Sequence, residues 1–117
     1  MNGYFQPHEY ACKCGCGTAY VSPRALAKLN KLREIVGRPI YLNSACRCPV
    51  HNARVGGAPL SEHRSTEDRP STAFDISLRN IDKQTIIHAA EQAGFGGIGV
   101  RYRTFVHVDD RGRRARW

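Results

Sequence analysis

Hydrophobic residues in the first third of the chain repeat at the spacing of a helix. Four of them recur at every third position and form one apolar stripe: Leu26, Leu29, Leu32 and Ile35. Ser22-Pro23 is a favourable start, because Ser caps the first turn and Pro suits the first helical position. Gly37 and Pro39 end the pattern. We therefore expect a helix whose stripe packs into the core.

A second helix is expected over residues 83–93. Asp82 precedes it as a cap and Gly94 follows it as a stop. Its inward-facing residues are Ile86, Ile87, Ala90 and Ala93. Residues 49–55, which are closed by Gly56-Gly57, are expected to form a third, short helix.

Strands are indicated by alternation of apolar and polar residues. Over residues 72–78, Phe74, Ile76 and Leu78 alternate with smaller or polar residues. This pattern predicts a half-buried strand with Asp75 on the face opposite the core. Further strands are expected at 40–44, near 98–102 and at 104–109, where Val106 and Val108 point to the core.

The order of these elements predicts an α+β fold, with a small antiparallel sheet and helices packed on one side. The 117 residues fit a single domain, 1–117. Residues 1–21, which are rich in Gly and Cys, are expected to form an irregular arm, and 58–71 a loop.

The net charge of +8 favours a polyanionic partner. Nucleic acid and an anionic bacterial wall are both candidates, but no zinc finger, basic heptad helix or aromatic RNA-binding signature is present. The densest basic segment is 111–117, for which a solvated tail and a wall-binding role stay open. No apolar run approaches the ~20 residues of a membrane span. The start of the chain has no features of a signal peptide, so we expect synthesis in the cytoplasm.

Two histidines and a carboxylate suggest a metal site. His63 lies in the predicted loop, Asp75 on one strand and His107 on another. Two histidines and one carboxylate are a ligand set of catalytic zinc, which keeps one position for water. Residues two apart on a strand share a face, so Asp109 and Phe105 project beside His107. This arrangement predicts a metallohydrolase.

Five cysteines form a separate group: Cys12, Cys14, Cys16, Cys46 and Cys48. Thiolates at such spacings are able to bind a second, structural zinc. Disulfides after export and free, packed thiols are the alternatives, although an odd number leaves one cysteine unpaired. In each case we expect the group to tie the arm to the segment around Cys46 and Cys48.

Four short motifs resemble, in order, those of the zinc D-Ala-D-Ala carboxypeptidase family. They are Ser44–Asn52 (SACRCPVHN), Ser61–His63, Ala73–Asp75 and the stretch from Gly97 to Asp109. This family also includes vancomycin-resistance dipeptidases and many phage endolysins, and shares its fold with the hedgehog domain. The resemblance covers residues 20 to 117. It implies zinc held by His63, Asp75 and His107, and cleavage of peptides in peptidoglycan.

The resemblance also implies roles for residues around the metal. Arg47 matches an arginine that meets the substrate or the developing oxyanion, and Arg supplies a forked donor that Lys lacks. Ser61 matches a serine that holds substrate. Asp109 is expected to be the general base, with the alternative that it orients the His107 imidazole. In many members an acidic residue precedes the second His by three positions, where this chain has Thr104.

Other polar residues near these motifs have lesser roles. His51 and Asn52 are expected to fix the loop below the site. His8 and His88 have no motif support and are expected on the surface.

The chain departs from the family between His63 and Asp75. Eleven residues separate them, against six in the family pattern, and Ser71 stands where the family has Gly. The difference is interpreted as a five-residue insertion in a surface loop, where insertions cost little. Glu67 or Asp68 of that loop is the alternative to Asp75 as a ligand.

The favoured function is that of a monomeric zinc peptidase acting on peptidoglycan, as a phage or prophage wall hydrolase that reaches the wall after release or as part of a virion. Which bond is cleaved is not encoded by any motif. Two alternatives remain: an inactive, zinc-containing binding module of the same fold, and a basic virion assembly or nucleic-acid-binding protein.

Overall fold

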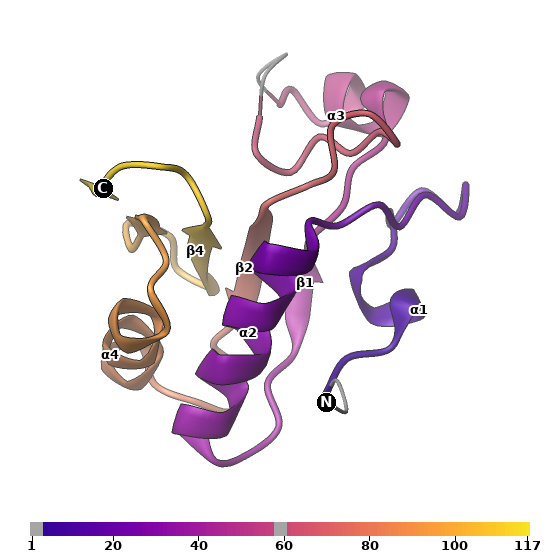
Figure 1. Cartoon of the computed structure of the whole chain (residues 1–117). Coiled ribbons are helices and arrows are strands. Elements are labelled where there is room, and N and C mark those ends of the chain that lie inside the picture. Colours follow the sequence, from indigo (N-terminus) through magenta and orange to yellow (C-terminus); the bar gives the residue numbers. More distant parts are fainter. Residues whose placement is uncertain (1–3, 58–60) are drawn as a thin grey trace.

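A five-stranded sheet is the frame of the molecule in the computed structural model, which describes residues 4–57 and 61–117 (Figure 1). Its strands lie in the order β1-β2-β4-β3-β5. Their bounds are Leu42–Ser44 for β1, Ala73–Ser77 for β2, Gly97–Gly99 for β3, Phe105–Asp109 for β4 and Ala115–Arg116 for β5. All described pairs are antiparallel except β3 with β5, which is parallel. The α+β fold is therefore as the sequence predicts.

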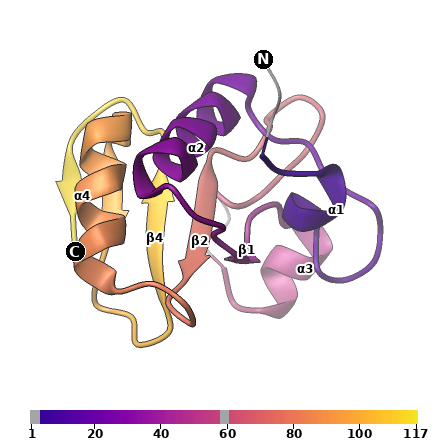
Figure 2. The ribbon, with the colours of Figure 1, turned by 90° about the horizontal axis from the view of Figure 1, so that it is seen from below.

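Two long helices cover one face of the sheet, α2 (Pro23–Val36) and α4 (Lys83–Ala93) (Figure 2). Each has the expected caps: Ser22 Oγ accepts from the Ala25 amide, and Asp82 accepts from the Thr85 amide. Gly37 and Gly94 end the helices with φ of 77° and 92°, in the left-handed region that glycine tolerates. None of the described helices is long and apolar enough to cross a bilayer.

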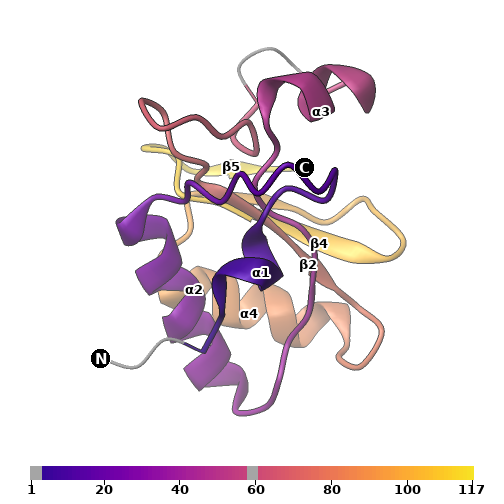
Figure 3. The same ribbon diagram turned by 90° about the vertical axis from the view of Figure 1, so that its right-hand side faces the viewer.

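The two short helices lie elsewhere. Figure 3 shows α3 (Pro49–Arg54) on the opposite side of the sheet from α2 and α4, and α1 (Pro7–Tyr10) lies near β1. The arm is thus less irregular than expected, and it contributes Phe5 to the core. The face of the sheet toward α3 is the one on which His63, Asp75 and His107 meet.

The core lies between the sheet and the helices. Phe74, Ile76, Val106 and Val108 are fully buried against α2 and α4, as the alternation predicts. However, β2 is not half-buried, because all five of its residues, including Asp75, are buried. The segment from His63 to Ser71 is tied to two other segments, because Arg64 pairs with Arg47 and Ser71 pairs with Val21 in isolated bridges.

The bounds of several strands differ from expectation. β3 ends at Gly99 rather than near 102, and β1 begins at Leu42 rather than at 40. β5 was not expected, because a two-residue strand leaves no periodicity and depends on pairing with β3. The basic segment 111–117 is therefore partly a sheet edge. Ile35, expected in the stripe, is 37% exposed at the end of α2.

Candidate active site

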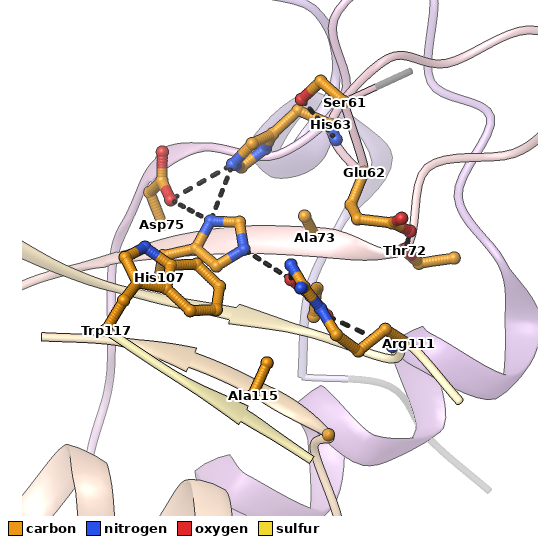
Figure 4. Close-up of polar contacts among 12 residues, drawn as sticks. Ser61, Glu62, His63, Thr72, Ala73, Asp75, His107, Arg111, Ala115 and Trp117 are labelled. Atoms are coloured by element: carbon orange, nitrogen blue, oxygen red, sulfur yellow. Dashed lines mark hydrogen bonds and ion pairs between the residues drawn. The ribbon is translucent and has the colours of Figure 1, made fainter. Parts of the chain in front are cut away.

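The register of two strands brings the central residues together. Antiparallel pairing of β2 with β4 sets Asp75 directly opposite His107, and a turn after Ser61 carries His63 over them. Asp75 Oδ1 lies 3.1 Å from His63 Nε2 and 3.2 Å from His107 Nδ1 (Figure 4). The two nitrogens are 3.3 Å apart. One oxygen and two nitrogens thus converge on a single point.

The outer nitrogen of each imidazole has an acceptor of its own. His63 Nδ1 lies 2.7 Å from the Ala45 carbonyl, and His107 Nε2 lies 2.7 Å from Asp109 Oδ2. Because a carbonyl or carboxylate only accepts, both outer nitrogens carry the proton. The inner nitrogens then present electron pairs toward Asp75. Three electron pairs that face one another call for a cation between them.

These distances fit a metal site. Zn–N and Zn–O bonds of about 2.0–2.1 Å in a tetrahedron place neighbouring ligand atoms about 3.3 Å apart. The three observed separations are close to that value. Acceptors behind both imidazoles are also the usual support of zinc-bound histidines. The donor set therefore fits zinc with the fourth direction toward solvent.

Charges in the cluster shift its pKa values. When the inner nitrogens are protonated in place of binding a cation, they donate to Asp75. Burial then raises the pKa of Asp75, but the hydrogen bonds from His107 and His63 outweigh this and lower it to about 2. Burial lowers the pKa of His107, whereas bonds with Asp109 and Asp75 raise it more strongly, so the net shift is upward. A proton on Nδ1 and a metal ion compete for the same electron pair.

Asp109 is enclosed behind His107. Its side chain is 0% exposed, and Arg111 donates to it from Nε and Nη2 at 2.7 Å and from its amide at 3.1 Å. Burial raises the pKa of Asp109, but the bonds with His107 and Arg111 hold it well below its usual range. Gly97 on β3 makes room, since a Cβ there would lie 2.4 Å from Asp109 Oδ1.

A pocket of about 530 Å³ opens above the cluster. One wall is aromatic, with Tyr102 stacked on Phe105 at 4.5 Å and Trp117 5.1 Å from the His107 ring. Trp117 Nε1 donates to the Tyr102 hydroxyl at 2.8 Å. Gly99 admits the indole, because a Cβ there would lie 2.6 Å from Trp117 Nε1. The basic residues that line the pocket are Arg47, Arg111 and Arg113.

Comparison with protein families places the chain in a known group. The family model described as peptidase M15 matches residues 3–109. The chain belongs to the peptidase M15 family. M15 peptidases use zinc, and the membership supports a metallopeptidase. Among curated proteins, none matches the chain significantly.

The other predicted residues of this M15 domain have definite positions. Arg47 lines the pocket, and its Nη1 donates to Asn52 Oδ1 at 3.3 Å. Asn52 is buried and its carbonyl accepts from the Gly57 amide, so it fixes the loop as expected. Ser61 also lines the pocket, while its Oγ accepts from the His63 amide at 3.2 Å.

Three histidines lie outside the cluster. His51 Nδ1 is buried without a hydrogen-bond partner among the described residues, and the His51 amide donates to Cys48 Sγ. His51 therefore supports the loop through its backbone. His8 and His88 are exposed, as expected for residues without motif support.

The inserted loop stays away from the cluster. Glu67 and Asp68 are exposed, and the ligand atoms that converge at this pocket belong to Asp75 and the two histidines. The loop is closed at its base by Ser71, whose amide donates to the Tyr20 carbonyl at 2.9 Å and whose Oγ donates to the Glu62 carbonyl at 3.0 Å. Ser71 thus uses its hydroxyl where the family has Gly.

The pocket-lining residues that sequence reasoning missed include Glu62, Arg111 and Trp117, together with Tyr102 and Arg113. Glu62 has no predicted role within the Ser61–His63 motif, although it lines the pocket. Arg111 and Trp117 lie in the segment that was expected to be a solvated or wall-binding tail. The signal that identifies them is the Gly97-Ile98-Gly99 pattern, in which two glycines on one face of a strand indicate close approach by other side chains.

Proposed function

We propose that this chain is a zinc peptidase that hydrolyses peptide bonds in peptidoglycan stem peptides, as a carboxypeptidase or endopeptidase of the phage or prophage type. The observation that carries the proposal is the convergence of His63, Asp75 and His107 at the floor of a basic pocket in a member of the M15 family. Buried ligands with fixed tautomers and an open side match a catalytic rather than a closed structural site.

The ligands are assigned to specific atoms. His63 holds the metal through Nε2, His107 through Nδ1 and Asp75 through Oδ1, because these atoms face one another. Zinc held by these atoms would supply a Lewis acid for the scissile carbonyl and would lower the pKa of bound water to about 7. The acceptors at Ala45 and Asp109 keep each imidazole in the required tautomer.

We assign Asp109 the orienting role. It reaches the metal site only through His107, and its oxygens already accept from Arg111 and His107. A buried carboxylate with a depressed pKa is a poor acceptor for a proton from water. The role of general base for Asp109 thus has less support than the role of orienting His107.

Glu62 is the better candidate for proton transfer. Among the described residues that line the pocket, Glu62 and Asp75 are the two carboxylates, and Asp75 is engaged by both histidines. Glu62 Oε2 accepts from the Thr72 hydroxyl at 2.5 Å (Figure 4). Its other oxygen, Oε1, lies 3.9 Å from Arg69 Nη2. In this role Glu62 takes a proton from the attacking water and returns it to the leaving amine.

The pocket walls favour an anionic peptide. Stem peptides carry carboxylates, which are favoured partners of a guanidinium group. Arg47 lines the pocket, and its Nη1 is held by Asn52. The aromatic wall of Tyr102, Phe105 and Trp117 provides an apolar surface for a short peptide. Ser61 is proposed as a further substrate contact at the rim.

The test compares the wild-type protein with His107→Ala on purified peptidoglycan and on defined muropeptides. We expect the wild type to release new amino groups and His107→Ala to release none, with a folded circular dichroism spectrum in both. Pull-down by peptidoglycan without release supports the inactive binding module instead. Salt-sensitive binding of duplex or single-stranded DNA, with no release from peptidoglycan, supports the nucleic-acid alternative.

A further inference from the structure

Four cysteines converge on the side of the molecule near α3, apart from the catalytic cluster. The Sγ atoms of Cys12, Cys14, Cys16 and Cys48 all lie within 4.8 Å of one another. The fifth cysteine does not join them: Cys46 is fully buried, and its Sγ donates to the Tyr20 carbonyl at 3.3 Å. The sequence alone did not distinguish Cys46 from Cys48.

A tight reversal of the arm builds this cluster. The Cys12 amide donates to the Thr18 carbonyl at 2.7 Å, so the chain returns on itself within a few residues. Gly15 and Gly17 have φ of 88° and 85°, which residues with side chains rarely adopt. These two glycines alternate with the cysteines and turn successive sulfurs toward Cys48, which follows Arg47 on a distant segment.

The exposure of the loop shows that apolar packing does not hold it. Residues 13–17 are all exposed, including Cys14 and Cys16, although cysteine is among the residues most often buried. Cys12 is the buried anchor, at 4% exposed. A loop with this little burial needs another source of order to keep four sulfurs together.

Backbone amides already point at two of the sulfurs. The Cys48 amide donates to Cys12 Sγ and the His51 amide donates to Cys48 Sγ, each at 3.4 Å. Amide donors stabilise the negative charge of a thiolate and are a usual support of sulfur ligands. These two donors therefore favour a negative charge on the sulfurs of Cys12 and Cys48.

The sulfur separations fit a tetrahedral metal. Zn–S bonds of about 2.3 Å place neighbouring sulfurs about 3.8 Å apart. Cys12 and Cys14 are separated by 3.4 Å, and Cys14 and Cys48 by 3.7 Å. A disulfide requires about 2.05 Å and joins sulfurs only in pairs. Four sulfurs at mutual contact are better matched by one shared cation.

We propose that Cys12, Cys14, Cys16 and Cys48 bind one structural zinc ion, separate from the catalytic metal. The four thiols lose their protons to solvent on binding, and no oxidant is needed. The ion clips the N-terminal arm to the residue next to Arg47. Its function is to fix the arm and the start of α3, and so to hold one wall of the pocket.

The test measures zinc content and metal environment in the full chain, independently of activity. Wild-type protein purified under reducing conditions is expected to hold about two zinc ions per chain. The double variant Cys14→Ser/Cys16→Ser is expected to hold about one, as is His63→Ala/His107→Ala. Cys46→Ser is the matched control and is expected to keep both.

A second measurement does not require the cysteine variants to fold. The His63→Ala/His107→Ala variant keeps all four cysteines, and cobalt is bound to it in place of zinc. We expect intense sulfur-to-cobalt charge-transfer bands and four thiols that resist alkylation until chelator is added. Cobalt spectra without these bands would overturn the proposal, as would a disulfide between any two of the four cysteines. The cobalt spectra are independent of the proposed peptidase activity, because this variant lacks two of the proposed catalytic ligands. If the wild type fails to cleave peptidoglycan, the test of the cysteine site is not affected.

Discussion

Asp109 contacts His107 on the nitrogen that faces away from Asp75. The Nε2–Oδ2 distance is 2.7 Å, and the opposite nitrogen, Nδ1, lies 3.2 Å from Asp75 Oδ1. A single imidazole therefore connects the buried Asp109, which is paired with the partly exposed Arg111, to the face that carries Asp75. The contacts thus run in the order Arg111, Asp109, His107 and Asp75, with the proposed metal site between the last two.

Replacement of Asp109 tests this order. Asp109→Asn keeps the size of the side chain but weakens its hold on the His107 tautomer. We expect zinc affinity to fall by about 10–100-fold, measured by competition with a chromophoric chelator. Unchanged affinity with turnover reduced by about 10²–10⁴-fold would instead identify Asp109 as the base.

Glu62→Gln tests the proton carrier. Turnover on a defined muropeptide is expected to fall by about 10²–10⁴-fold, because the amide cannot accept the proton, while zinc content stays at the wild-type level. Glu67→Gln in the exposed loop is the matched control and should leave both unchanged. Equal activity of the two variants would remove Glu62 from the mechanism.

Arg47→Lys tests the binding of an anionic substrate. Lys keeps the charge but loses the forked geometry, so kcat/KM is expected to fall while the catalytic zinc remains bound. Arg54→Lys on the exposed side of α3 serves as the control. Wild-type kinetics for Arg47→Lys, measured on the same muropeptide, would contradict the assignment.

Gly97→Ala tests whether the glycines of β3 make room for the site. The new Cβ would lie 2.4 Å from Asp109 Oδ1 and 2.6 Å from Arg111 Nε, so the buried pair must shift. We expect a loss of about 1–3 kcal/mol in the free energy of unfolding, measured by denaturant titration. Gly112→Ala, with no atom within 4 Å of its Cβ, should cost far less. Equal stability of the two variants would show that β3 tolerates side chains there.

The sequence predicted the parts of the molecule that depend on local patterns. The periodicities and caps of α2 and α4 are visible in short windows, and so is the alternation that puts Val106 and Val108 in the core. The strands that carry Asp75 and His107 were predicted, but the register that sets these two residues opposite each other was not, because a strand pattern does not specify its partner. The identity of His63, Asp75 and His107 as metal ligands stays a prediction for the zinc measurements.

The rest depended on contacts between distant segments. β5 is two residues long and exists because it pairs with β3, which no local pattern reports. Arg111 and Trp117 turn inward only because Gly97 and Gly99 leave space for them. Cys48 joins the sulfur cluster and Cys46 does not, and this difference likewise depends on the position of the N-terminal arm. The Cys46 amide donates a hydrogen bond to the Tyr10 carbonyl of that arm. In each case the deciding partner is far along the chain.

The two ends of the exposed loop between His63 and Asp75 lie close together. The Thr66 amide donates to the Arg69 carbonyl at 3.1 Å, and the Arg69 amide donates to Thr66 Oγ1 at 3.0 Å. Ser71 anchors the base of the loop, and Glu67 and Asp68 at its tip are exposed. Exposed tips with neighbouring ends accept inserted domains well. A foreign module, such as one chosen to target a particular bacterium, can therefore be spliced between Glu67 and Asp68 with the metal ligands left in register.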